Sequence, residues 1–507
     1  MKALPLSLVL VALLAAGVRT QEAPHGRGLA PGRGDLHSKG WEVAMRLRGA
    51  PIPPRFPELG RDARRVALEN GLVLFLRPDR RLPLVQFEAL VRVGERYEKP
   101  EEYGVAGLLG TMLRTGGTEQ WKPQDLDDRL AFLAANLNVA VGEESGSVSL
   151  DLLSKDAEEG LSIFAEVVRR PAFDEGRLAL ARRRAVNGIL HRNDNPGQIL
   201  DRELSALFYP EAHPAGRSLT PARLAAATRD RIRDFYGRHF RPENVRIALV
   251  GDFDEEAMLA KARERFGDWP RGGEPLGPPP KFEPKAHPGL FLVDKEVNQS
   301  SIAVAHPGID RDNPDRHAVA LMNAILGGGS FSSRITERVR SDEGLAYSAR
   351  SSFPTGGREP EPFQATVQTK TATTARAIAL LEEEIRKMQA GPISKNEFDT
   401  ARESALYGMV FRNDRPVEAV RRLMRLEFDG LQADQDRRDF EGVSAVTPEA
   451  VVTAAKRYLR PDALTIFVVG EGKAIEADLA ARGEPTRVAP AEYDFASFRD
   501  AGFAPGK

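Results

Sequence analysis

The 507-residue sequence contains no cysteine, which excludes disulfide bonds, thiolate metal ligands and cysteine nucleophiles. The chain also has no large excess of positive or negative charge. Its 72 Lys and Arg residues nearly balance its 73 Asp and Glu residues, and the net charge is −1. This balance gives no electrostatic reason to expect nucleic acid or an acidic membrane surface as a partner. Hydrophobic residues make up 41% of the chain, as in ordinary soluble globular proteins.

Long hydrophobic runs are confined to the N-terminus. There Lys2 precedes the apolar stretch ALPLSLVLVALLAAG, which small and polar residues follow. This order is typical of a secretory signal peptide, and the run is too short for an ordinary membrane span. We therefore expect residues 1–21 to be a signal peptide and the mature protein to be periplasmic or extracellular, without an integral membrane segment. Residues 22–60 are rich in Gly, Pro and Arg and are expected to form a disordered leader.

Regular patterns begin after this leader. VALENGLVLFLRPD predicts a hairpin that turns at Asn70-Gly71, and PLVQFEALVRVG and NVRIALVGDF predict further strands. A Pro- and Gly-rich stretch near residue 280 predicts a linker, and a second series of strands and helices follows it. Apolar residues at helical spacing predict helices over 102–114, 123–136, 156–169, 175–192 and 198–208.

The two halves of the chain share landmarks at one offset. Thr228 and Thr447 begin related stretches that end at Gly251 and Gly470, and both pairs are separated by 219 residues (447 − 228 and 470 − 251). RNDNP recurs as RNDRP 220 residues later (412 − 192). Such agreement predicts a tandem duplication of an α+β unit. We therefore expect domains over 61–270 and 289–480, a linker over 271–288 and an irregular tail over 481–507.

Several common catalytic motifs are missing. LGGGSFSSR at 326–334 has no lysine to reach a phosphate and is interpreted as a loop before a helix, and no G-x-S-x-G elbow occurs. None of the eight histidines is three or four residues from another, so no helix offers a two-histidine zinc face. His213 and His306 are interpreted as loop residues without a chemical role.

Two glycines interrupt a helical pattern in GVAGLLGTMLRTGGT (104–118), where Gly107 and Gly110 each cost about 1 kcal/mol relative to Ala. The chain resembles the M16 peptidases, the family of insulinase and the mitochondrial processing peptidase. Three stretches carry the resemblance: this one, LENGLVLFLRPDRRLPLV and LGGGSFSSRITERVRSDEGLAYS. The resemblance implies an α+β fold of two tandem homologous, metallohydrolase-like domains. Each would have a mainly antiparallel sheet packed with helices, and the two would enclose a chamber.

Active members of that family carry H-x-x-E-H on a first-domain helix, with two zinc-binding histidines and a glutamate base. The resemblance places Gly107 and Thr111 at the histidine positions and Gly110 at the glutamate position. The third ligand position falls on Gly188, 77 residues after Thr111 (188 − 111). The resemblance therefore implies a vacated zinc site and no metal in this chain. Because small residues permit close approach, we expect the two helices to pack closely there, without a metal-sized polar pocket.

The signature of the second domain is intact. Arg340 and Tyr347 in RVRSDEGLAYS match the arginine and tyrosine that face the zinc in active members. By resemblance, the guanidinium would bind substrate carbonyl oxygens and the phenol would donate to the oxyanion of a tetrahedral intermediate. The alternative is a solvated helix residue and a packing residue of a strand. Within the same signature, Gly327, Gly328 and Gly329 are candidates for binding a peptide backbone.

Three functions remain open. The first is a non-catalytic subunit of an exported zinc peptidase, which would supply Arg340 and Tyr347 in trans to a zinc-bearing M16 partner around an extended peptide. Zinc would then be bound only by the partner. The second is a non-enzymatic homodimer whose chamber holds peptides, as a chaperone does. The third is an active peptidase by another route, for which Glu143 and Glu144 are the candidate ligands, although VGEESGS is more typical of a polar turn.

Overall fold

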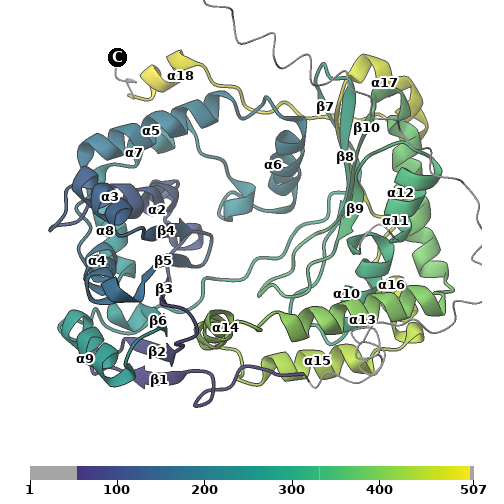
Figure 1. Ribbon diagram of the computed structural model, residues 1–507. Helices are drawn as coiled ribbons and strands as arrows, with labels where there is room; N and C mark the ends of the chain where they lie inside the picture. Colours follow the sequence, from purple (N-terminus) through teal and green to yellow (C-terminus); the bar gives the residue numbers. More distant parts are fainter. Residues whose placement is uncertain (1–53, 330–331, 503–507) are drawn as a thin grey trace, which may run out of the picture. The chain divides into compact units, whose positions relative to one another are not determined.

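The framework of the protein is a pair of six-stranded sheets (Figure 1). The structure, a computed structural model, describes residues 54–329 and 332–502, so the predicted signal peptide and most of the predicted leader lie outside the described residues. The strands of the first sheet are β1 (Arg64–Ala67), β2 (Val73–Pro78), β3 (Leu84–Val91), β4 (Asn136–Val141), β5 (Gly146–Leu153) and β6 (Val245–Gly251). The strands of the second are β7 (Gly289–Asp294), β8 (Gln299–His306), β9 (Ala349–Ser352), β10 (Phe363–Lys370), β11 (Thr465–Gly470) and β12 (Thr486–Arg487).

The two sheets repeat one topology, with orders β1-β2-β6-β3-β5-β4 and β12-β7-β11-β8-β10-β9. In the first sheet β2 is parallel to β6, and β3 is antiparallel to β6 and β5. In the second sheet β7 is parallel to β11, and β8 is antiparallel to β11 and β10. The strands β4 and β9 occupy equivalent edges, each antiparallel to its neighbour. The predicted tandem duplication is therefore confirmed.

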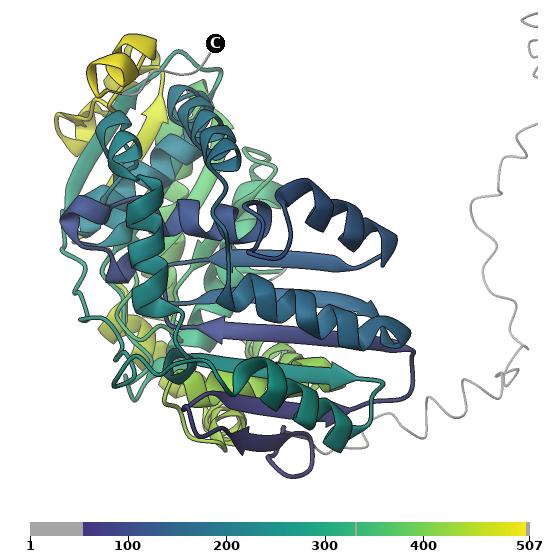
Figure 2. The ribbon, with the colours of Figure 1, turned by 90° about the vertical axis from the view of Figure 1, so that its left-hand side faces the viewer.

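Helices of its own half cover one face of each sheet, and Figure 2 shows those of the first half in front of its strands. Those of the first half are α2 (Val105–Thr115), α3 (Pro123–Phe132), α4 (Ala157–Arg169), α5 (Glu175–Leu190), α6 (Pro196–Phe208), α7 (Pro221–Ala226), α8 (Arg229–His239) and α9 (Glu255–Phe266). Those of the second are α10 (Arg316–Asn323), α11 (Arg334–Thr336), α12 (Thr374–Ala390), α13 (Lys395–Phe411), α14 (Pro416–Phe428), α15 (Gln435–Ala445), α16 (Pro448–Tyr458) and α17 (Gly472–Leu479). The five helices predicted between 102 and 208 are confirmed, with boundaries within four residues.

The repeated sequence landmarks have repeated local roles. The hydroxyls of Thr228 and Thr447 accept backbone N–H groups at the starts of α8 and α16, so both threonines are N-caps. Pro196 and Pro416, from the RNDNP and RNDRP motifs, occupy the first positions of α6 and α14, where proline leaves no hydrogen bond unmade. The duplication signal was therefore carried by residues that start helices.

Each half packs one helix against the sheet of the other half. From α6, Leu204 and Phe208 pack with Ala303 and Phe467 of the second sheet. From α14, the buried residues Val420, Leu423 and Phe428 pack with Phe75 and Ala248 of the first sheet. Ion pairs fix α14 further, because Arg421 meets Glu88, and Glu427 meets both Arg65 and Arg246. The two sheets are thus joined by a reciprocal exchange of equivalent helices.

Two sequence predictions are wrong in this part of the structure. The tail is not irregular, since β12 pairs with β7 and α18 (Phe495–Asp500) places Phe498 in the core of the first half. A two-residue strand and a six-residue helix are too short to leave a periodic pattern that could be detected. His306 is not a loop residue but the buried last residue of β8, stacked on Phe363. Within the described ranges, no helix has the length and apolar character needed to cross a membrane.

Candidate functional site

Helix α2 carries Gly107, Gly110 and Thr111, three of the four positions that the sequence resemblance assigns to a vacated zinc site. Its start is organised by Glu98, whose carboxylate accepts the N–H groups of Gly104 at 3.1 Å and Ala106 at 2.7 Å. A carboxylate at this end also complements the helix dipole. Val105, Leu109 and Met112 are buried in the core, whereas Gly107 is exposed and Thr111 half-buried on another face.

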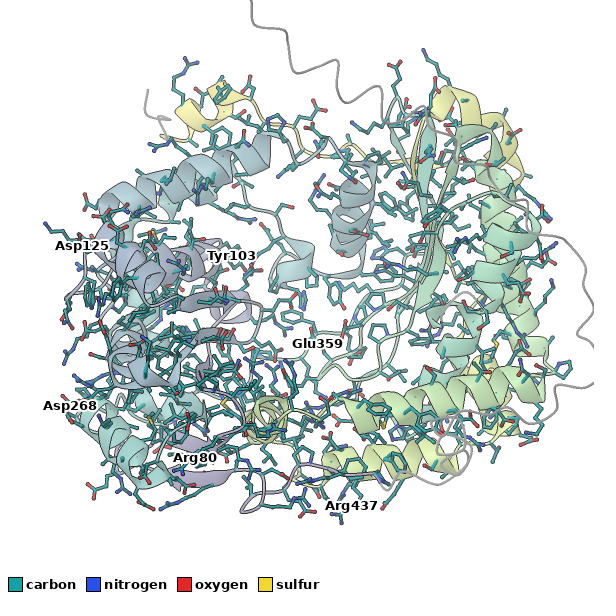
Figure 3. All side chains as sticks on the ribbon, viewed as in Figure 1. Arg80, Tyr103, Asp125, Asp268, Glu359 and Arg437 are labelled. Carbon is teal, nitrogen blue, oxygen red and sulfur yellow. The ribbon has the colours of Figure 1, made fainter. Side chains whose placement is uncertain are left out.

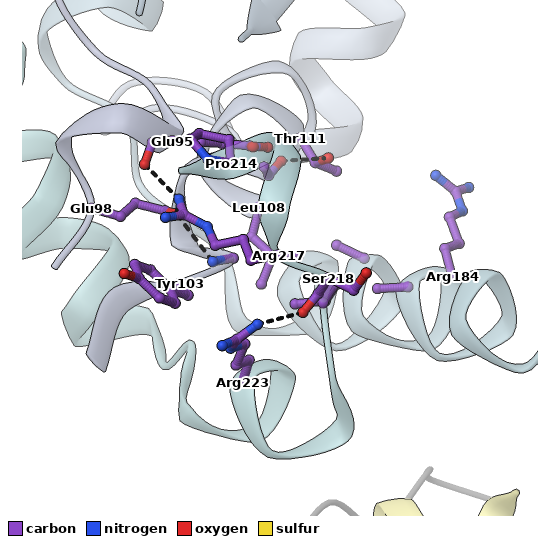
Figure 4. A pocket seen from close by; sticks show the side chains of 15 residues that line it. Glu95, Glu98, Tyr103, Leu108, Thr111, Arg184, Pro214, Arg217, Ser218 and Arg223 are labelled. Atoms are coloured by element: carbon purple, nitrogen blue, oxygen red, sulfur yellow. Dashed lines mark hydrogen bonds and ion pairs between the residues drawn. The ribbon is translucent and has the colours of Figure 1, made fainter. Parts of the chain in front are cut away.

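A cavity of 450 Å³ lies beside Gly107 and Thr111 (Figure 4). Its other walls come from α5, from the loop before α2 and from the segment around α7. The main lining residues from these walls are Ala181, Arg184, Ala185, Glu95, Glu98, Tyr103, Arg217, Ser218 and Arg223. The site that the glycines mark is therefore an open space, lined by charged side chains and by apolar groups such as Leu108, Ala181 and Leu219.

The prediction that α2 and α5 pack closely at the glycines is wrong. A Cβ atom added to Gly107 or Gly188 would meet no neighbouring described atom within 4 Å. Gly188 follows Arg184 by one helical turn but does not line the cavity. Only Gly110 is tightly packed, and its neighbour is Val141 of β4, at 3.3 Å from the added Cβ. The small residues leave open space, because both helices are held by the core on their other faces.

The electrostatics of the cavity centre on a buried ion pair. Arg217 meets Glu98 at 2.6 Å, with 6% and 1% of the two side chains exposed, and stacks over the ring of Tyr103 at 3.8 Å. Burial raises the pKa of Glu98 to about 7, against the opposing effects of the two backbone N–H groups and Arg217. Burial also raises the pKa of Glu95. A second guanidinium, that of Arg223, donates to the Ser218 carbonyl at 2.6 Å.

The residues present do not fit zinc. Within residues 54–329 and 332–502, no three or more His, Asp or Glu side chains are grouped so that they could hold a metal ion. The carboxylates lining the cavity are those of Glu95 and Glu98, and Glu98 is already engaged by Arg217 and by two N–H groups. No catalytic step at this cavity can therefore be derived through a metal bound by these side chains.

The second-half signature places its two predicted residues together. Arg340 lies on the π-helical turn η8 (Glu337–Asp342), and its guanidinium carbon is 4.9 Å from the centroid of the Tyr347 ring. Tyr347 precedes β9 and is 86% exposed, so its alternative role as a packing residue of a strand is wrong. The turn between them is held by the Leu345 N–H, which donates to Val339 O at 3.0 Å.

The glycines of the same signature are packed against their own chain. Gly327 lies against β9, and a Cβ added to it would be 2.6 Å from the backbone nitrogen of Ser351. An added Cβ at Gly328 would meet the Asn323 side chain at 2.3 Å, and one at Gly329 would meet Ala324 O at 2.6 Å. The close backbone approach at Gly327 is thus made by β9, and contact of these glycines with a substrate stays a prediction.

Sequence reasoning missed a polar cluster that joins the two halves. Arg96, with 2% of its side chain exposed, meets Glu359 on the β9–β10 loop at 2.5 Å. Figure 3 labels Glu359, which lies between the two halves. His213, which the sequence placed in a loop without a role, is buried and lies 2.7 Å from the same carboxylate. Burial raises the pKa of Glu359, but hydrogen bonds from His213 and Arg96 outweigh burial and hold it at about 2. Residues this far apart in sequence share no spacing that could have revealed the cluster.

The pair Glu143 and Glu144 lies in the turn between β4 and β5, as the sequence predicted for VGEESGS. The carboxylate of Glu144 meets the guanidinium of Arg358 at 2.7 Å and extends the polar cluster between the halves. Glu144 thus has a structural partner, and neither carboxylate belongs to a group that could hold a metal within the described part of the chain.

Comparison with known proteins places both halves in one family. Residues 83–222 match the insulinase domain of peptidase family M16, and residues 226–405 match the domain described as the peptidase M16 inactive domain. An uncharacterized zinc protease of Rickettsia bellii is 26% identical over 343 residues, which cover 66% of this chain and 80% of that protein. One of Mycobacterium tuberculosis is 26% identical over 419 residues, which cover 80% and 93%. The crystal structure of a peptidase M16 inactive domain from Pseudomonas fluorescens has a TM-score of 0.71 at 26% identity, covering 85% of this chain and 100% of that one.

Proposed function

Because this chain belongs to peptidase family M16, we propose that it is the non-catalytic subunit of an exported zinc peptidase. It would contribute Arg340 and Tyr347 in trans to a partner of the same family that binds the zinc. The observation that carries this proposal is the contrast between an Arg340–Tyr347 pair whose phenol is exposed and an α2 helix without metal ligands. The expected signal peptide supports export to the periplasm or the outside of the cell.

The chemistry of this pair suits a site completed by another subunit. A phenol that is 86% exposed is free to donate to an oxyanion that develops on a substrate held opposite. The Arg340 guanidinium lies against the ring and orients the phenol, and by the family resemblance it would also bind substrate carbonyl oxygens. Neither group needs a metal in its own chain to act in this way.

The fold also offers a place for an extended peptide. Strand β4 lies at the edge of the first sheet and packs beside α2. An edge strand presents backbone N–H and C=O groups that an added peptide strand can pair with. We therefore include an extended peptide as the substrate, held next to the vacated site.

The test is reconstitution with a zinc-bearing M16 subunit of the same organism, assayed on an unstructured peptide. We expect little turnover from either chain alone and turnover from the mixture. Tyr347→Phe should lower kcat of the mixture by about 10²-fold, the scale of one oxyanion donor, and Arg340→Ala should also lower it. Tyr407→Phe, a change at another exposed tyrosine, is the matched control. Undiminished turnover with both variants would contradict the role in trans.

A second candidate, a homodimeric peptide-binding protein without catalysis, is favoured by the cavity that remains beside α2. Peptide binding by the isolated, zinc-free chain together with self-association in sedimentation experiments would support it. Metal analysis of the purified chain tests the proposal that zinc is bound only by a partner. Stoichiometric zinc in this chain alone would contradict both candidates.

A further inference from the structure

We propose that the cavity beside Gly107 and Thr111 binds a carboxylate of a peptide, either an acidic side chain or the C-terminal carboxylate, with Arg184 as its counter-ion. This inference rests on the part of the proposed function in which the chain binds peptides. The ligand group is a carboxylate, bound at the place where an active relative would hold the scissile peptide bond.

Arg184 is the one guanidinium in the cavity wall without a partner in residues 54–329 and 332–502. Arg217 is held by Glu98 and by the Glu95 carbonyl at 2.5 Å. Arg223 is held by the Ser218 carbonyl and by Glu211. Arg184 is exposed on α5, and Figure 4 shows its side chain standing apart from the other two arginines. Its five donors are therefore available to a ligand.

The space around Arg184 admits a bidentate ligand. Its wall neighbours Ala181, Ala185 and Gly107 are small, and a Cβ atom at Gly107 would still meet nothing within 4 Å among the described atoms. The volume of 450 Å³ lies within the range of about 300–1,000 Å³ that is usual for ligand pockets. A planar guanidinium with open space before it matches the geometry of a carboxylate, which accepts two parallel N–H bonds.

The opposite end of the cavity fixes which way the ligand lies. Glu95 and Glu98 are on that side in Figure 4, away from Arg184. The charge of Glu98 is countered by Arg217, whereas the Glu95 carboxylate forms no hydrogen bond or ion pair within the described part of the chain. Since like charges repel, an incoming carboxylate is directed to the α5 side, and a peptide N–H or a basic side chain to the Glu95 side.

The experiment measures binding of a labelled unstructured peptide to the zinc-free full chain by fluorescence anisotropy. One form of the peptide is neutral and amidated at its C-terminus, a second has a free C-terminal carboxylate, and a third is amidated with one internal glutamate. We expect at least one acidic form to bind about three- to tenfold more tightly than the neutral form, the scale of a partly exposed charge-assisted pair. The form that gains affinity identifies the source of the carboxylate.

The variants isolate Arg184. Arg184→Ala should abolish the gain, Arg184→Lys should keep part of it, and Glu95→Gln should increase it because an opposing charge is removed. Arg183→Ala, at an exposed neighbour that does not line the cavity, should leave it unchanged. Thermal unfolding checks that each variant stays folded.

If all three peptides bind equally and Arg184→Ala changes nothing, the carboxylate site is overturned while peptide binding stands. If the neutral peptide and both acidic forms fail to bind, the proposed function fails as well.

Discussion

The helical segment that follows β3 in the first half and the one that follows β8 in the second half both contain glycine, but for opposite reasons. In the first half Gly107 of α2 faces a cavity, and an added Cβ would meet no described atom within 4 Å. In the second half Gly327 lies in the π-helical turn Ala324–Gly328 that continues α10, and it would place a Cβ 2.6 Å from the backbone of β9. One glycine borders open space, and the other stands where no side chain fits. A glycine in a family motif therefore has to be interpreted from its surroundings.

The largest expected effect tests whether the halves depend on each other through the exchanged helices. Phe428→Ala and Phe208→Ala each remove a buried ring, which should lower the free energy of unfolding by about 3–5 kcal/mol. Phe428 belongs to the second half but packs on the first sheet, so its loss should shift the urea unfolding of the first half. Tryptophan fluorescence reports that transition, because Trp121 and Trp269 both lie in the first half.

The matched control for these two variants is Phe411→Ala, at a ring that is 60% exposed on α13. A change at such a surface position should stay within about 0.5 kcal/mol. If Phe428→Ala left the tryptophan transition where it is in the wild type, the dependence between the halves would be contradicted.

The polar cluster between the halves gives the next largest effect. Arg96→Met would remove the main partner of Glu359 and leave that carboxylate buried, with His213 as its remaining side-chain partner. We expect a loss of about 3 kcal/mol in the free energy of unfolding, measured by urea denaturation. Arg358→Met removes a partly exposed pair with Glu144 and should cost less than about 1 kcal/mol. Equal losses in the two variants would show that the burial of Arg96 is irrelevant.

The same cluster predicts a pH dependence. The pKa of Glu359 is about 2 in the folded protein, below its ordinary value of 4.5, so the carboxylate stabilises the fold above pH 4.5. This contribution, about 3 kcal/mol for a shift of that size, should disappear as the pH falls from 4.5 to 2. Urea midpoints measured through this range should fall more steeply for the wild type than for Glu359→Gln, whose side chain does not titrate. Parallel curves would exclude Glu359 as the source.

The smallest expected effect returns to the glycines of α2. Gly107→Ala fills open space on a helix and should raise the free energy of unfolding by about 0.5–1 kcal/mol. Gly110→Ala should gain less, because its Cβ would press on Val141 at 3.3 Å. Thermal unfolding of the two single variants compares them directly. A larger gain at Gly110 than at Gly107 would contradict the cavity.

Patterned features of this fold could be predicted from the sequence, and features made by distant contacts could not. The threonine caps and proline starts of the duplicated helices are local, so the related stretches that begin at Thr228 and Thr447 were enough to predict the second copy. Arg340 and Tyr347 were singled out by the resemblance to the M16 signature, and the structure brings them together. Nothing local indicated that Arg96 would meet Glu359, that α6 would pack on the second sheet, or that Arg184 would line a cavity with Gly107. Whether small residues leave a gap or a close contact depends on how neighbouring elements are held.

The exchange of α6 and α14 also decides how the chain can be divided. A cut within the segment 271–288, which contains neither helix nor strand, would leave each fragment with a helix that fits only the other fragment's sheet. The fragments should therefore stay together after such a cut, whereas either one expressed alone would expose the apolar faces of its helix and its sheet to water. The boundary that is easiest to draw along the sequence is therefore not a boundary between units that fold alone.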